Sequence, residues 1–249
     1  MPDKAPSSSI PGGTSRFATT HWSVVLAAGS ASSPDYQRAL STLCQTYWYP
    51  LYAYLRRRGH DSHQAEDYTQ AFFVQMLEKG YLSRVEPKPG KFRSFLLTAL
   101  RHFLADQRDR DRAVKRGGGK ESLPLNFQAA EGRYTLEPAN DLSPEKVFER
   151  SWALTLLEKT MDRLEAELAG MNKAELFDSL KVYLCGHAAL VPYRDVAAEL
   201  NMTEGAVKVT VYRLRRRYRE MLRDEIAQTV STPEQIEQEI RDLFAALAR

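Results

Sequence analysis

The chain has 249 residues, enough for one large domain or two of modest size. Its 35 Lys and Arg residues face 32 Asp and Glu, and the net charge of +3 does not by itself indicate a nucleic-acid-binding protein. With 43% hydrophobic residues the chain can bury a packed core, which excludes a wholly disordered protein.

Three absences in the sequence bear on where the protein works. No apolar run approaches the roughly 18 residues that a membrane-spanning helix needs, and the first residues lack the apolar stretch of a signal peptide. The two cysteines, Cys44 and Cys185, provide neither a disulfide framework nor the paired spacing of a metal site. We therefore expect a cytoplasmic, soluble protein without a metal or another cofactor.

The N-terminal part differs in composition from the rest of the chain. Residues 1–16 are rich in Ser, Pro and Gly, and a short apolar segment follows at 21–28 before Gly29. We expect residues 1–30 to be a flexible extension that carries one short helix.

Three helices are predicted within residues 31–116. In the first, apolar residues recur every three or four positions; Pro50 should kink or divide the helix, and Gly59 ends it. The second begins at Asp61, where Gln64 three positions later completes a capping box. The third has a clean apolar stripe, formed by Phe92, Phe95, Leu96, Ala99, Leu100, Phe103 and Leu104.

The next segment, residues 117–143, contains three consecutive glycines and two prolines and has no sustained hydrophobic period. We expect it to be a flexible linker. Helical periodicity returns over residues 144–230, with Ser143 as the N-cap and Pro144 at the first helical position. A capping box later in this block is predicted at Asn172.

A last amphipathic helix is predicted within residues 231–249, with an apolar face made of Ile236, Ile240, Leu243 and Leu247. Two roles are open for this helix: it caps the core of the second helical block, or it shields the basic helix that precedes it. Because no run of alternating β-branched residues occurs, the predicted fold class is all-α, with two helical domains joined by the linker.

The strongest local pattern lies at residues 192–219. A short helix meets Asn201, which tolerates the left-handed conformation of a tight turn, and Thr203 can cap the next helix. Between Lys208 and Arg219 this second helix has six basic residues and no acidic one. Such a helix-turn-helix could read base edges in the DNA major groove and contact phosphates. The alternative is a solvated basic face on an ordinary helix.

The first helical block has a different basic surface. Its cations alternate with aromatic residues, as in proteins that bind single-stranded DNA by stacking the bases and following the backbone. The aromatic residues are Tyr81, Phe92, Phe95 and His102. Because two of them also belong to the apolar stripe of the third helix, a role in the core is the competing interpretation.

Three segments together resemble the extracytoplasmic-function (ECF, group IV) family of bacterial RNA polymerase sigma factors. Residues 64–73 (QAEDYTQAFF) resemble the acidic second helix of region 2, and residues 92–106 with the following arginines resemble the promoter-melting helix. Residues 193–197 and 203–217 resemble the helix-turn-helix of region 4. The three segments occur in the order of the family, separated by the predicted linker.

The resemblance implies a non-enzymatic initiation factor that directs core RNA polymerase to promoters. Region 2, residues 31–116, would bind the polymerase β′ clamp helices and would recognise and melt the −10 element. Region 4, residues 144–230, would read the −35 element and contact the β flap. An anti-sigma factor and a Ser/Thr kinase are further candidate partners, and no membrane contact is expected.

The implied site residues form three sets. The polymerase-binding set is Glu66, Asp67 and Gln70. The −10 set is Arg84, Lys91, Arg93, Arg101, His102, Asp106 and Arg108. The −35 set is Thr203, Glu204, Lys208, Tyr212, Arg213, Arg215, Arg216 and Arg219.

The chain departs from the family pattern at several positions. Gln64 and Ala71 stand where the family has acidic residues, which weakens the negative face of the second helix. Phosphorylation of Thr69 would add roughly −1.5 to −2 of charge there, and this is the reason for considering a kinase. Phe95 and His102 replace the usual Trp and Asn, so the preferred −10 bases are expected to differ.

Two other classes of protein are the alternatives. A helix-turn-helix regulator that acts without melting DNA would normally carry an α/β receiver or ligand-binding domain, and the sequence predicts none. A helical metallohydrolase could use His60, His63, Glu66 and Asp67, but His60 precedes the helix cap and so does not share a helical face with the others. The sequence therefore favours the sigma-factor interpretation.

Overall fold

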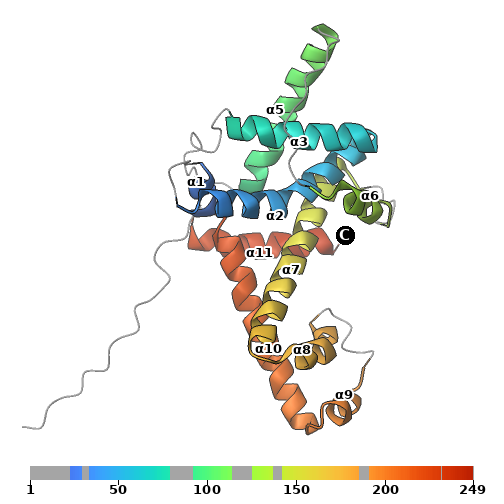
Figure 1. The fold of residues 1–249 in the computed structure, drawn as a ribbon, viewed down its shortest axis with the longest axis vertical. Helices are drawn as coiled ribbons and strands as arrows, with labels where there is room; N and C mark the ends of the chain where they lie inside the picture. Colours follow the sequence, from blue (N-terminus) through green and yellow to red (C-terminus); the bar gives the residue numbers. More distant parts are fainter. Residues whose placement is uncertain are drawn as a thin grey trace, which may run out of the picture.

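The computed structural model of the protein describes residues 23–29, 34–78, 92–113, 125–136, 142–184, 191–230 and 232–248. In these residues the regular structure is entirely helical, as predicted (Figure 1). Within the same residues, no helix combines the length and the apolar character that crossing a membrane requires. The predictions for residues 1–22, and for Tyr81, Arg84 and Lys91, lie outside the described residues.

The N-terminal half is built in layers around one long helix. Figure 1 shows α3, α2 and α11 lying one below another, with α5 crossing α3 and projecting beyond it. The bounds are α1 Ser23–Ala28, α2 Tyr36–Arg57, α3 Ser62–Glu78 and α5 Phe92–Ala113. The short helix α1, expected from the apolar segment before Gly29, packs on α2 through its buried residues Val25 and Ala28.

Local capping signals set the ends of these helices as predicted. Gly59 has a φ of +91°, a left-handed conformation that stops α2. Asp61 and Gln64 form the capping box: the Gln64 amide donates to Asp61 Oδ1 at 2.8 Å, and the Asp61 amide donates to Gln64 Oε1 at 3.4 Å. Pro50 lies inside α2 without dividing it, so that part of the expectation is wrong.

The expected flexible linker contains a helix, α6, at Phe127–Leu136. Its first residue packs against Trp48 and Tyr52 of α2, with ring centroids 5.5 and 5.7 Å apart. The Arg133 guanidinium lies over the ring of Tyr49, 4.2 Å from its centroid. These aromatic and cation–π contacts with α2 explain why a segment of weak periodicity is helical here.

A second long helix, α7 (Pro144–Gly170), continues through both halves of the molecule. It begins as predicted, with Ser143 Oγ accepting from the Lys146 amide at 3.3 Å and Pro144 in the first turn. Its first half is part of the N-terminal core, where Phe148 and Trp152 are buried beside α2. The boundary expected at residue 144 therefore does not separate two independent cores.

The C-terminal half holds the shorter helices and the first part of α10. After α7 come α8 Ala174–Leu180, the 3-10 turn Lys181–Tyr183, α9 Tyr193–Glu199 and α10 Glu204–Ala227. The capping box predicted at Asn172 is wrong: Asn172 has a φ of +56° and ends α7, and α8 begins after Lys173 without a side-chain cap. An Asn in the left-handed region is a common way to end a helix.

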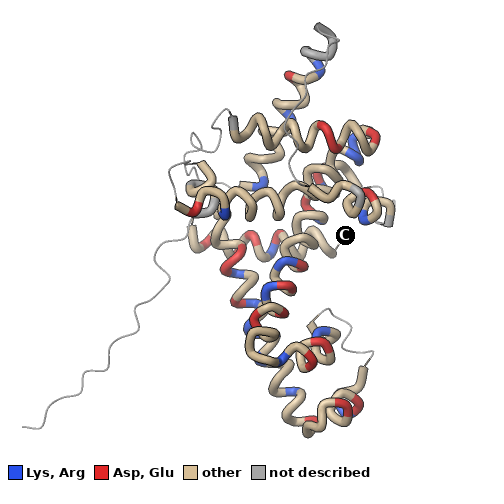
Figure 2. Tube along the Cα trace, viewed as in Figure 1, with Lys and Arg blue, Asp and Glu red and all other residues tan. Residues whose placement is uncertain are grey.

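Two hydrophobic cores share α7 and α10. The larger one contains α1, α2, α3, α5 and α6, the first half of α7, the end of α10 and α11. The smaller one contains the second half of α7, α8, α9 and the first part of α10. Ion pairs join α7 and α10 between the cores: Glu225 lies 2.8 Å from Lys159 and 3.0 Å from Arg163, and Arg217 bonds Glu167. Figure 2 shows the mixed charges along this shared segment.

The last helix, α11 (Pro233–Leu247), is present as predicted but packs differently from both expected roles. It lies against α7 and α10 and belongs to the larger, N-terminal core, in which Leu243 is fully buried. It therefore neither caps the smaller core nor covers the start of α10. Through its apolar face, α11 packs the C-terminal end of the chain against the N-terminal half of the molecule.

Candidate nucleic-acid interface

A tight turn at residues 200–203 joins helices α9 and α10. The amide of Met202 donates to the carbonyl of Ala197 at 2.8 Å, and Asn201 has the predicted left-handed conformation, with a φ of +52°. Thr203 Oγ1 accepts from the Ala206 amide at 3.2 Å and so caps α10. The apolar stripe of α10 packs inward: Val207, Val211, Leu214 and Leu222 are buried, and Tyr218 is half-buried.

We expect Thr203→Ala to lower the free energy of unfolding by about 1 kcal/mol, because it removes the side-chain acceptor at the start of α10. Thr210→Ala is the matched control on the same helix. The Thr210 hydroxyl donates to the Ala206 carbonyl within the helix, so its loss should change stability by less than about 0.5 kcal/mol. Urea unfolding followed by circular dichroism measures both; equal effects would contradict the capping role.

The outer face of α10 exposes the polar and aromatic residues expected to meet DNA. Tyr212 is 66% exposed, and Arg213, Arg216 and Lys208 are exposed along the same side. The ammonium of Lys208 lies 2.6 Å from Glu204 and 5.6 Å from the centroid of the Tyr193 ring. The hydrogen bond to Glu204 raises the pKa of Lys208, so it stays a cation at neutral pH.

Other arginines of α10 are engaged inside the protein. Arg215 donates from two nitrogens to the carbonyl of Tyr183, at 3.3 and 3.0 Å, and thereby ties α10 to the 3-10 turn. Arg217 bonds both oxygens of Glu167, and this hydrogen bond lowers the pKa of that carboxyl group. Arg219 is exposed and lies beside a mostly apolar groove of about 750 Å³ between α7, α10 and α11. Most residues of the −35 set are therefore exposed, whereas Arg215 holds α10 against the 3-10 turn.

One exposed residue of this face was missed by the sequence analysis. Val209 is 50% exposed although it is apolar, and it lies one helical turn before the exposed residues Tyr212 and Arg213 of α10. Aliphatic groups at such a position can contact the methyl group of thymine in the major groove. The signal was available in the sequence, because Val209 falls outside the apolar stripe that begins at Val207.

Helix α3 has an apolar inner face and a polar outer face. Asp67 is exposed, and Glu66 and Gln70 are half-exposed, with Gln70 Nε2 3.5 Å from Glu66 Oε1. Figure 2 shows acidic residues at the N-terminal end of this helix. The structure therefore brings the three predicted polymerase-binding residues together on one accessible surface.

Thr69 lies on the opposite, inner face of α3. Its side chain is completely buried, and its hydroxyl donates to the carbonyl of Ala65 at 2.7 Å. In this structure the hydroxyl is inaccessible, so phosphorylation of Thr69 would require α3 to move away from the core. The helical period explains the burial, because Thr69 follows Ala65 by four residues and precedes Phe73 by four.

Helix α5 carries the described part of the −10 set. His102, Asp106 and Arg108 are exposed on its projecting half. Arg101 is also exposed, but it bonds Glu145 at the start of α7 at 2.7 Å. The aromatic residues divide as the core interpretation expected: Phe92 and Phe103 are buried and Phe95 is partly buried. Of the described candidates for base stacking, His102 is the exposed one.

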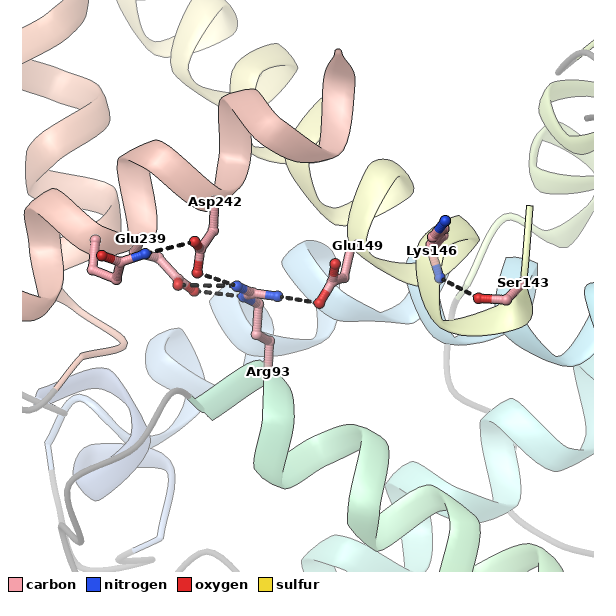
Figure 3. A network of polar contacts seen from close by, with 7 residues as sticks. Arg93, Ser143, Lys146, Glu149, Glu239 and Asp242 are labelled. Carbon is pink, nitrogen blue, oxygen red and sulfur yellow. Dashed lines mark hydrogen bonds and ion pairs between the residues drawn. The ribbon is translucent and has the colours of Figure 1, made fainter. Parts of the chain in front are cut away.

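Arg93 does not belong to the exposed surface, contrary to the sequence prediction (Figure 3). It is 6% exposed, and its guanidinium bonds both carboxylate oxygens of Glu239, at 2.6 and 3.1 Å, and Glu149 at 2.9 Å. It also lies over the ring of Trp152, 4.8 Å from the centroid. Burial acts to lower the pKa of Arg93, but the hydrogen bonds and charges of Glu239 and Glu149 outweigh it and raise the pKa.

The burial of Arg93 has a signal in the sequence. Arg93 precedes Leu100 by seven residues and Leu104 by eleven, a spacing that places all three on one face of a helix. Glu239 likewise follows Ile236 by three residues and precedes Leu243 by four, on the apolar face of α11. An arginine on one buried stripe and a glutamate on another point to a buried ion pair.

The residues weighed as a metal site do not come together. Among the described residues, no group of three or more His, Cys, Asp or Glu side chains is arranged to hold a metal ion. The ring of His60 packs instead edge-on against Tyr68, with centroids 5.2 Å apart.

Comparison with known families gives one assignment. Residues 43–114 match the family described as Sigma-70 region 2. This segment spans the central helix α2, the acidic helix α3 and α5, and it is less than a third of the chain. The search of curated proteins and the search of solved structures gave no match. The match supports a sigma-70 factor, and hence a role in promoter-directed transcription.

Proposed function

We propose that the protein is an ECF-type sigma factor that binds core RNA polymerase and directs initiation at specific promoters, without catalytic activity of its own. The observation that carries this proposal is the region 2 match over residues 43–114, in which α3 presents an acidic surface and α5 exposes His102, Asp106 and Arg108. In this scheme Glu66, Asp67 and Gln70 on α3 bind the β′ clamp helices.

The −10 element would be held by the projecting half of α5. In this scheme the exposed His102 stacks on an unpaired base, Arg108 contacts the backbone of the displaced strand, and Arg101 does so by exchanging Glu145 for a phosphate. Asp106 can accept a hydrogen bond from an amino group of a base. Arg84 and Lys91 stay predicted contacts that lie outside the described residues.

The −35 element would be read by α10. Its exposed N-terminal face offers Lys208, Val209, Tyr212, Arg213 and Arg216 to a major groove, in the arrangement that helix-turn-helix proteins use. Glu204 and Thr203 at the helix start complete this face, with Arg219 further along the helix. The internal bonds of Arg215 leave it with a positioning role for α10, in place of the predicted DNA contact.

Run-off transcription tests the proposal. Purified protein and core RNA polymerase are incubated with a promoter chosen by selection from a library of random sequences. We expect transcripts that start at one position and that require both components. A helix-turn-helix regulator would bind the selected duplex but give no initiation with core polymerase alone, and this result would contradict the proposal.

A further inference from the structure

The polar cluster around Arg93 joins helices that are distant in the sequence. Figure 3 shows Arg93 reaching from α5 toward Glu149 of α7 and toward Glu239 and Asp242 of α11. Asp242 lies 3.3 Å from the guanidinium, and Glu239 is only 2% exposed. The contact between Arg93 and Glu239 spans 146 positions. The cluster therefore attaches the end of the chain to the first turn of α5.

Further contacts support this attachment. The amide of Phe92, the first residue of α5, lies 3.4 Å from the carbonyl of Thr229 just before α11. Leu243 of α11 is fully buried in the N-terminal core. On the next turns of α5, Arg101 bonds Glu145 of α7. The first half of α5 is thus held against α7 and α11.

Three carboxylates, those of Glu149, Glu239 and Asp242, share the one guanidinium of Arg93. Removing such groups from water offsets most of the attraction between them, so a buried cluster of this kind contributes little net stability. Phosphate can replace carboxylate as a bidentate partner of arginine. The structure therefore holds Arg93 in a contact that a nucleic-acid backbone can replace.

We propose that α11 is an intramolecular latch that restrains α5 in the free protein. By binding Arg93, it withdraws a cation from the basic surface of α5 and keeps α5, α7 and α10 in one closed arrangement. Release of α11 frees Arg93 for the DNA backbone and loosens the attachment between the two halves. The latch rests on the proposed function only in its assignment of α5 to DNA binding.

The experiment compares two full-length variants that lose the same charge from the same helix. The latch variant is Glu239→Gln with Asp242→Asn. The control variant is Glu234→Gln with Glu237→Gln, because Glu237 pairs with Arg223 of α10 and neither residue bonds Arg93. Circular dichroism first establishes that both variants keep their helical content.

Two measurements on the free protein report the latch. Hydrogen exchange of the α11 amides should be about tenfold faster in the latch variant than in the control. The affinity for a fluorescein-labelled single-stranded oligodeoxynucleotide, measured by anisotropy, should be about five- to tenfold higher. If the latch variant unfolds globally, Asp242→Asn alone is used, because Asp242 is one-third exposed and its loss disturbs the core less.

The outcomes separate the latch from the proposed function. Faster exchange in α11 together with tighter DNA binding supports the latch. Exchange and affinity equal to those of the control overturn it, whether or not the wild-type chain initiates transcription with core polymerase. Faster exchange without any gain in DNA affinity also overturns it, since Arg93 would then not be withheld from DNA. Failure of the wild-type chain in run-off transcription counts against the proposed function. The attachment of α11 is still tested in that case, by the hydrogen-exchange measurement.

Discussion

Replacing Lys208, Arg213 and Arg216 together by alanine should weaken binding to a selected duplex by about 100- to 1,000-fold. All three side chains are exposed on the outer face of α10, and none of them lies in either hydrophobic core. Each cation that contacts a phosphate or a base edge contributes about 1 kcal/mol or more, which gives about 3–4 kcal/mol for the three. The salt dependence should fall as well, with a log–log slope smaller by about 2–3.

The control for this experiment removes the same charge elsewhere. Arg38, Lys146 and Lys173 are exposed on α2, on α7 and in the turn before α8. Replacing them by alanine should change the affinity by less than about threefold at moderate salt, because their fields are screened. Fluorescence anisotropy over a series of salt concentrations measures both variants. Equal losses would show that α10 attracts DNA only through the overall charge of the protein.

Reversing the charge of the α3 surface should weaken the complex with core RNA polymerase by at least about 100-fold. In the variant Glu66→Lys with Asp67→Lys, two carboxylates that would face a basic partner become cations, and such a juxtaposition costs several kcal/mol. Both positions are at least partly exposed on the outer face of α3. The fold should therefore keep its stability to within about 1 kcal/mol.

A matched reversal on α7 tests whether position matters. Asp162 and Glu165 are exposed on the helix shared by the two cores, and changing both to lysine gives the same net charge. Polymerase affinity, measured by anisotropy of the labelled factor, should then stay within about threefold of wild type. If both variants bind core polymerase as the unmodified protein does, α3 is not the polymerase-binding surface.

The sequence determined the features that depend on neighbours a few residues away. The caps at Ser143 and Thr203, the capping box at Asp61 and the left-handed turn at Asn201 all occur as predicted. These contacts join groups within about one helical turn, so the local sequence contains all that is needed. The exposed face of α10 follows from the same helical period.

Features that depend on contacts between helices were predicted less well. The helix α6 was expected to be linker because its own period is weak, and it is held by the aromatic rings of α2. Asn172 was read as a cap for the next helix, although it ends the one before. The local sequence of residues 127–136 is compatible with a helix or a loop, and packing against α2 selects the helix. An Asn at position 172 is compatible with the start or the end of a helix, and here it ends α7.

The composition, the helical periods and the caps by themselves determined an all-α chain with a polar face on α3 and a cationic face on α10. Only the tertiary structure decided that Arg93 meets Glu239, that α7 runs through both cores and that α11 closes the N-terminal one. The physical reason is that an amphipathic helix specifies which of its faces is buried but not which other helix covers that face. The covering helix is selected by the shape and charge of buried stripes far apart in the chain, here an arginine on one and a glutamate on the other.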